Sequence, residues 1–188
     1  MNLTIKNCTI VNEGKLSEND LLIKNGRIEK IDTSIDVKGD FIEAEGLHLL
    51  PGFIDDQVHF REPGLTDKGS IRSESIAAVV GGTTSFMDMP NVVPPTLNMD
   101  LWNQKNRIAE QDSLANYSFY MGSSNTNIEE VKSIDPSQVC GLKVFMGTST
   151  GNLLVDDPKA LEDIFNFSPV LITTHCEDTP LITENEKK

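Results

Sequence analysis

The sequence predicts an α/β protein in which a parallel sheet follows a short N-terminal β module. Two observations carry this prediction. Apolar runs end near residues 60, 89, 121, 146 and 175, a spacing of roughly 30 residues that is typical of a βαβ unit. Stretches with helical signals lie between these runs, and strands that alternate with helices usually form a parallel sheet.

Residues 1–50 are expected to form the small β module. Residues 20–24 and 27–31 have strand character, and Asn25 and Gly26 lie between them. Asn-Gly between two such runs is the strongest short-range hairpin signal, because both central residues of a type I′ turn need a positive φ. Fifty residues of strands cannot close a core of their own, so this module must pack against another part of the protein.

Three helices are expected in the remainder of the chain. Residues 70–80 form the first, which glycines 81–82 terminate. In the third, Asp157 is a good N-cap and Pro158 occupies the first helical position. One face of the second helix is expected to carry Leu97, Leu101 and Ile108.

Composition narrows the classes of protein and partner. The 188 residues include 16 Lys and Arg against 29 Asp and Glu, a formal net charge of −13, which disfavours nucleic acid and anionic membranes as partners. Three widely spaced cysteines suit a reducing compartment better than a disulfide framework. The N-terminus lacks the features of a signal peptide, and no apolar run approaches the ~20 residues that span a bilayer. We therefore expect a cytoplasmic protein.

The segment 51–64, PGFIDDQVHFREPG, concentrates the residues that carry chemistry. Strand alternation would place four polar side chains on one face and three apolar ones on the other. The polar set is Asp55, Gln57, His59 and Arg61, and the apolar set is Ile54, Val58 and Phe60. The polar face either lines a cavity at the strand ends or is the solvated face of an antiparallel strand.

This segment resembles the first-strand signature of the dihydroorotases, in the cyclic-amidohydrolase superfamily, which usually reads PGxIDxHxHFREPG. The resemblance continues through residues 81–91 (GGTTSFMDMPN), which match the family's GGxT…MPN segment. Residues 141–147 (GLKVFMG) and 174–177 (THCE) extend it. These four blocks occur in order, each at the end of an expected strand.

The resemblance implies a metal-dependent (β/α)8 barrel with a small β-sandwich built from both chain termini. Residues 1–50 would belong to the sandwich, and residues 51–188 would form the first half of the barrel, with about five strands, because a complete barrel takes about 250 residues. The implied reaction is the reversible cyclisation of N-carbamoyl-L-aspartate to L-dihydroorotate in pyrimidine biosynthesis. The family's proton-shuttling aspartate lies on strand 8, beyond residue 188, so we expect residues 1–188 alone to be inactive.

Three side chains match the family's metal ligands. His59 matches the second histidine of strand 1, His175 the histidine of strand 5, and Lys143 the carboxylated lysine of strand 4. Lys143 also stands out on its own, because it interrupts a strand that is apolar on both faces, and burial favours a neutral amine that can take up carbon dioxide. The alternatives are hydrogen-bonded core imidazoles for the histidines and, for the lysine, a side chain that reaches past the strand end to solvent.

Gln57 departs from the family pattern, because it stands where the family has its first metal-binding histidine. An amide oxygen is a weak zinc ligand. One or two Zn²⁺ ions are therefore expected, with the second site in doubt.

Arg61 and Asn91 match the residues that bind the substrate's carboxylate. The planar guanidinium of arginine suits a carboxylate, and asparagine adds a neutral donor. The alternative for Arg61 is a surface ion pair with Glu62. Allantoinases and hydantoinases generally lack an arginine at this place and the MPN block. Arg61 and Asn91 therefore disfavour a different cyclic amidase.

Two readings of the function remain open. The first is a zinc-dependent dihydroorotase that acts on a small molecule. The second, motivated by Gln57, is a non-catalytic dihydroorotase-like subunit that supports another pyrimidine enzyme such as aspartate transcarbamoylase. The sequence leaves a homodimer open in either case.

Overall fold

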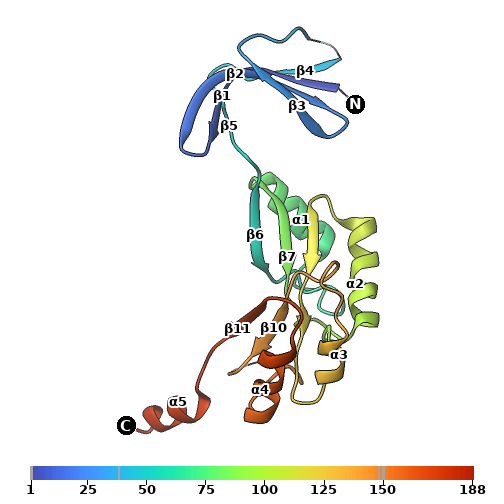
Figure 1. Ribbon diagram of the computed structural model, residues 1–188, viewed down its shortest axis with the longest axis vertical. Coiled ribbons are helices and arrows are strands. Elements are labelled where there is room, and N and C mark those ends of the chain that lie inside the picture. The colour runs from blue at the N-terminus through green and yellow to red at the C-terminus, as the bar shows by residue number, and fades with distance from the viewer. Residues whose placement is uncertain (1, 38, 148, 150) are drawn as a thin grey trace. The chain divides into compact units, whose positions relative to one another are not determined.

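The structure is a computed structural model that describes residues 2–37, 39–147, 149 and 151–188. The chain divides into two compact units, Met1–Gly52 and Phe53–Lys188 (Figure 1). Among the described residues, no helix is long and apolar enough to cross a membrane.

The first unit is a five-stranded sheet in the order β3-β2-β1-β4, with β5 also paired to β1. Its strands are β1 Asn2–Asn12, β2 Lys15–Lys24, β3 Arg27–Asp32, β4 Asp40–Glu43 and β5 His48–Leu49. The predicted hairpin is confirmed, because β2 and β3 pair antiparallel around Asn25 and Gly26, whose φ angles are 52° and 74°. Large apolar side chains remain exposed on this sheet, including Ile28 and Phe41, as expected of strands that cannot close a core alone.

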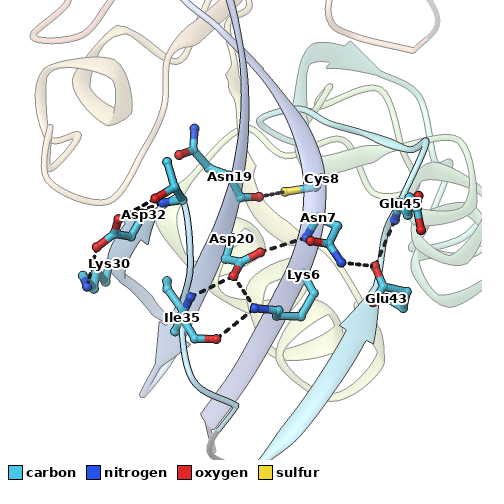
Figure 2. A network of polar contacts seen from close by, with 11 residues as sticks. Lys6, Asn7, Cys8, Asn19, Asp20, Lys30, Asp32, Ile35, Glu43 and Glu45 are labelled. Atoms are coloured by element: carbon cyan, nitrogen blue, oxygen red, sulfur yellow. Dashed lines mark hydrogen bonds and ion pairs between the residues drawn. The ribbon is translucent and has the colours of Figure 1, made fainter.

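A buried carboxylate organises the centre of this sheet. Asp20, on β2, pairs with the Lys6 ammonium and accepts backbone N–H groups from Asn7 at 2.9 Å and Ile35 at 2.8 Å (Figure 2). Lys6 also donates to the Ile35 carbonyl at 3.0 Å. Asn7 has a φ of 56° and lies at an irregularity in the pairing of β1 with β2, which turns its N–H towards the carboxylate. These contacts, led by the hydrogen bond from Lys6, lower the pKa of Asp20 from 3.8 to about 2.

The second unit contains two three-stranded parallel sheets, ordered β6-β7-β8 and β9-β10-β11. The strands are β6 Phe53–Val58, β7 Thr83–Asp88, β8 Asn116–Phe119, β9 Met121–Gly122, β10 Leu142–Phe145 and β11 Ile172–His175. Only Tyr120 separates β8 from β9. Its N–H donates to the Asp88 carbonyl on β7, whereas the next N–H, from Met121, donates to the Gly141 carbonyl before β10, each at 3.1 Å. One stretch of chain therefore joins the two sheets. The strands β7, β9, β10 and β11 end within about one residue of the positions that the apolar runs predicted.

Five helices accompany these strands, with α1 packed against β7 and α2 against β8 (Figure 1). They are α1 Ile71–Val80, α2 Met99–Asp112, α3 Ile128–Lys132, α4 Pro158–Phe167 and α5 Thr179–Glu186. The predicted N-cap at Asp157 and the predicted end of the first helix at Gly81 are confirmed. Ser70 accepts an N–H from the first turn of α1, Asp157 accepts two from the first turn of α4, and α1 ends before Gly81.

Two details of the expected elements are wrong. The buried face of α2 carries Trp102, Lys105 and Ala109 rather than Leu97, Leu101 and Ile108, because a buried lysine interrupts the apolar pattern. The first strand of the second unit ends at Val58, so His59 and Arg61 lie in the segment after it, and Arg61 has a φ of 70°. Strand alternation therefore does not extend through Arg61.

We expect Asp20→Asn to remove a specific part of the acid sensitivity of folding. A lowered pKa in the folded state means that the unfolded chain binds more protons between about pH 4 and pH 2, so the stabilisation by Asp20 is present above about pH 4 and is lost as the pH falls towards 2. Denaturant unfolding of the complete protein across this range measures the loss. Glu18→Gln, at an exposed acid on the same strand, is the control. Parallel pH profiles for wild type and Asp20→Asn would contradict the assignment.

Candidate functional site

The side chains singled out in the sequence lie at or just beyond the carboxyl ends of parallel strands. His59 follows β6, Asn91 follows β7, Lys143 lies within β10, and His175 is the last residue of β11. Ligand and active sites of α/β sheets lie at this edge, because the loops that follow the strands are there.

His59 and Asn91 make direct contact. The His59 Nδ1 atom lies 2.8 Å from the Asn91 Oδ1 atom. An amide oxygen can only accept a hydrogen bond, so Nδ1 carries the proton and Nε2 keeps a free lone pair. Burial of the ring lowers the pKa of His59, and the positive charge of Arg61 lowers it further, so both effects favour the neutral imidazole.

Lys143 is a buried amine without a polar partner. Its side chain is 4 % exposed, and it has no hydrogen bond or ion pair with any residue that the structure describes. The ammonium lies 5.0 Å from the centre of the Phe145 ring. Burial lowers the pKa of Lys143, because removal from water penalises the charged form. The expected burial of this lysine is therefore confirmed.

Lys105 shows what a compensated buried lysine looks like in the same unit. Its ammonium lies 2.6 Å from Asp88 Oδ2 and donates to the Met89 carbonyl at 2.8 Å. Both side chains of the pair are fully buried. Among the described residues, Lys143 has neither kind of partner, although burial lowers the pKa of both lysines.

Arg61 adds a second positive charge near His59. Both Arg61 and Lys143 lower the pKa of His59 through their charge. The alternative pairing of Arg61 with Glu62 is not formed, because Glu62 Oε2 instead accepts the Ile71 N–H at 2.8 Å, at the start of α1. Among the described residues, no ion pair involves Arg61.

His175 lies against a second group of residues. Its ring stacks on the Phe145 ring at 6.2 Å, and its Nε2 atom lies 2.8 Å from Glu177 Oε1. Gly147 permits this arrangement, because a Cβ atom there would lie 2.2 Å from Glu177 Oε2. Phe145 thus contacts both the Lys143 amine and the His175 ring.

Gln57 lies exposed on β6. Its backbone N–H donates to Asp55 Oδ1 at 3.1 Å, whereas its side-chain amide bonds to none of the described residues. At the position where the family has a metal-binding histidine, this chain can therefore supply only the amide oxygen of Gln57.

The residue types suit zinc, but the arrangement is incomplete as it stands. Zinc prefers imidazole nitrogen and carboxylate oxygen, and His59 keeps Nε2 free. Within the described ranges, no group of three His, Cys, Asp or Glu side chains could hold a metal. As they stand, the described residues therefore do not make a metal site, and carboxylation of the Lys143 amine would add oxygen donors to them.

Cys176, the residue after His175, does not pack in the core. Its side chain is exposed and lines a cavity of about 900 Å³ beside α4 and α5. Residues predicted to bind metal or substrate do not line this cavity.

The sequence analysis missed two fully buried charged residues of this unit, Asp88 and Lys105. Asp88 lies inside the motif GGTTSFMDMPN, where attention fell on the asparagine. The spacing of Trp102, Lys105 and Ala109 places a lysine in the middle of an apolar helical stripe, which is the signal that could have identified it.

Sequence comparison confirms the resemblance to dihydroorotases. The chain is 34% identical to dihydroorotase of Methanothermobacter thermautotrophicus over an alignment of 198 residues. The alignment covers 99% of this chain and 42% of the relative. Dihydroorotase of Methanosarcina acetivorans is 35% identical over 97% of this chain and 40% of its own length. An allantoinase of Desulfitobacterium hafniense is 31% identical over 97% of this chain and 42% of its own length. No protein-family model matches the chain.

Solved structures of related enzymes share this fold. The L-hydantoinase of Arthrobacter aurescens superimposes with a TM-score of 0.90 at 28% identity, over 98% of this chain and 43% of the hydantoinase. A D-hydantoinase gives a TM-score of 0.80 over the whole chain and 42% of its own length. The chain therefore spans about two fifths of the length of the relatives it matches, and its fold is that of an N-terminal part of these α/β enzymes.

We expect the Lys143 amine to take up carbon dioxide. The amine nitrogen forms a bond to the carbon of CO₂ and releases a proton, giving a carbamate anion. Because the pKa of Lys143 is lowered, its neutral fraction is larger than that of a surface lysine, and uptake rises as the pH increases. Carbon-13 NMR of the complete protein in labelled bicarbonate should show a carbamate signal.

The control for this experiment is a lysine exposed to solvent. The signal should disappear in Lys143→Arg and persist in Lys159→Arg, since Lys159 lies exposed on α4. A carbamate signal that survives Lys143→Arg would disprove the prediction.

Proposed function

We propose that this chain is the N-terminal part of a zinc-dependent dihydroorotase, which interconverts L-dihydroorotate and N-carbamoyl-L-aspartate. The observation that carries the proposal is the contact of His59 with Asn91 after two neighbouring parallel strands, with Arg61 two residues from His59 and free of any described acidic partner. A site with uncompensated positive charge, in a chain of net charge −13, suits an anionic substrate. Both dihydroorotate and carbamoyl-aspartate carry carboxylates.

Arg61 and Asn91 distinguish this proposal from the other cyclic amidases. Relatives named allantoinase and L-hydantoinase are similar over nearly the whole chain, so overall similarity does not choose the substrate. Rings such as hydantoin and allantoin lack the carboxylate that an arginine fork binds. The arginine in HFREPG therefore favours dihydroorotate.

In the proposed site each residue has a separate task. Arg61 binds and orients the substrate's carboxylate, and Asn91 adds a neutral contact while it holds His59. His59, His175 and carboxylated Lys143 would hold zinc, which when bound polarises the scissile carbonyl and activates water. The proton-shuttling aspartate of this proposal lies beyond residue 188, on the eighth strand of the (β/α)8 barrel. The parallel strands described here would begin that barrel, with β8 and β9, which only Tyr120 separates, counted as one strand.

Gln57 favours a second candidate, a dihydroorotase-like subunit without activity. Its exposed amide stands where a histidine ligand is expected, so one half of a binuclear site would be weakened. In this case the protein would support another pyrimidine enzyme such as aspartate transcarbamoylase, and its strand-8 aspartate would be dispensable. Turnover by the complete protein separates the two candidates.

Substrate choice tests the proposal directly. The complete protein is assayed with dihydroorotate, a substituted hydantoin and allantoin, and we expect turnover of dihydroorotate alone.

In Arg61→Met, kcat/KM for dihydroorotate should fall by about a hundredfold or more, roughly 3 kcal/mol, because the carboxylate loses its bidentate partner. Zinc content should stay unchanged. Arg72→Met, on α1, is the control for loss of an arginine. An Arg61→Met enzyme with ordinary kinetics would refute the role of Arg61, and preference for hydantoin or allantoin would refute the proposed substrate.

Metal content tests the role of Gln57. We expect the complete protein to bind fewer than two zinc ions per chain as purified, because an amide oxygen is a weak zinc ligand. Gln57→His should raise the occupancy measured by elemental analysis. The wild-type value should be close to that of Gln57→Ala. Two zinc ions per chain in both wild type and Gln57→Ala would contradict the prediction.

A further inference from the structure

The fully buried ion pair of Asp88 and Lys105 has no task in the site described above. Asp88 is the last residue of β7 and Lys105 lies in the middle of α2. Neither side chain is accessible to solvent, so neither can contact a substrate. Their remaining hydrogen bonds go to backbone groups that flank the site.

Asp88 binds the chain beside His59. Its Oδ1 atom accepts the Phe60 N–H at 3.0 Å. On the other side of His59, the Val58 carbonyl accepts the Met89 N–H at 3.0 Å. The residues before and after His59 are therefore both tied to the end of β7, which fixes the direction in which the imidazole leaves the backbone.

Lys105 binds the chain that leads to Asn91. Its ammonium donates to the Met89 carbonyl at 2.8 Å and lies 4.8 Å from the centre of the Phe119 ring. One residue further on, the Pro90 carbonyl accepts N–H groups from Val92 and Thr96. The segment that carries Asn91 is thus held between the ammonium of α2 and its own tight turn.

The two anchored segments meet where His59 Nδ1 lies 2.8 Å from Asn91 Oδ1. We propose that the Asp88–Lys105 pair is a positioning device that keeps His59 in the Nδ1-protonated tautomer, with Nε2 directed away from Asn91 and free to bind. Loss of either charge would leave the other buried without a partner, and the segments would shift to relieve it. The link to catalysis rests on the proposed function, whereas the geometry of His59 does not.

A second ion pair of the same design provides a matched control. In the first unit, the Lys6 ammonium pairs with Asp20 and also donates to the Ile35 carbonyl, while Asp20 accepts backbone N–H groups. Its loss should destabilise the protein without acting on the His59–Asn91 contact, because it lies in the other unit. Comparison of the two pairs separates positioning from general stability.

The test is nitrogen-15 NMR of histidine side chains in the complete protein, both as purified and after treatment with a chelator. His59→Gln assigns the His59 signals, and Asn91→Ala shows the spectrum without the amide acceptor. We expect Lys105→Met to lose the Nδ1-protonated signature of His59, as Asn91→Ala does. Lys6→Met should retain it at temperatures where both variants are folded.

Each other outcome decides against the proposal. Retention of the signature in Lys105→Met would show that the pair is only structural, and loss in Lys6→Met would show a general effect. If Lys105→Met does not fold, Asp88→Asn replaces it, since its amide oxygen still accepts the Phe60 N–H; failure of both to fold would mean a structural role. The spectrum requires no substrate, so an inability to hydrolyse dihydroorotate would remove the proposed function and leave this result intact.

Discussion

The geometry of the strand ends depends on one buried ion pair between Asp88 and Lys105. A buried pair is costly unless hydrogen bonds support it; here Asp88 Oδ1 accepts the Phe60 N–H and Lys105 donates to the Met89 carbonyl. The pair therefore couples the segment after β6, the segment after β7 and helix α2 at one point. The price of burying two charges is offset by hydrogen bonds to two loops that would otherwise be held mainly by their own turns.

Two buried lysines of the second unit, Lys105 and Lys143, have different surroundings. Lys105 is surrounded by an anion, a carbonyl and an aromatic face, whereas Lys143 has only the face of Phe145. Burial lowers the pKa of both lysines, because removal from water penalises an ammonium. At Lys105 the charge of Asp88 opposes this effect, whereas no described anion opposes it at Lys143.

Much of the fold could be predicted from the sequence because its signals are local. The Asn25-Gly26 hairpin, the cap at Asp157, the end of α1 at Gly81 and the 30-residue spacing each depend on a few neighbouring residues, and the structure contains all of them. The end of β6 at Val58 was not predicted, because the alternating pattern continues into a segment whose path is set by contacts with β7.

The candidate site was predictable in its residue types but not in its supports. Recognition of the motifs identified His59, Asn91 and Lys143, and the structure brings the first two into contact. Lys105 was missed because its burial depends on the ion pair with Asp88, which lies on another element. The sequence of α2 alone does not reveal that partner. Hydrophobic periodicity within one helix cannot reveal an ion pair with a residue that is distant in the sequence.

The engagement of Glu62 with the start of α1 has an electrostatic consequence at longer range. Since Glu62 Oε2 bonds to the Ile71 N–H, Arg61 forms no ion pair with any described residue, in a chain whose net charge is −13. An approaching anion is repelled by the chain as a whole and attracted only near the strand ends. Because the Debye length is about 8 Å at physiological ionic strength, salt screens the distant repulsion more than the close attraction. Moderate salt should therefore favour the capture of small anions by this molecule, the reverse of its effect on an enzyme whose whole surface attracts its substrate.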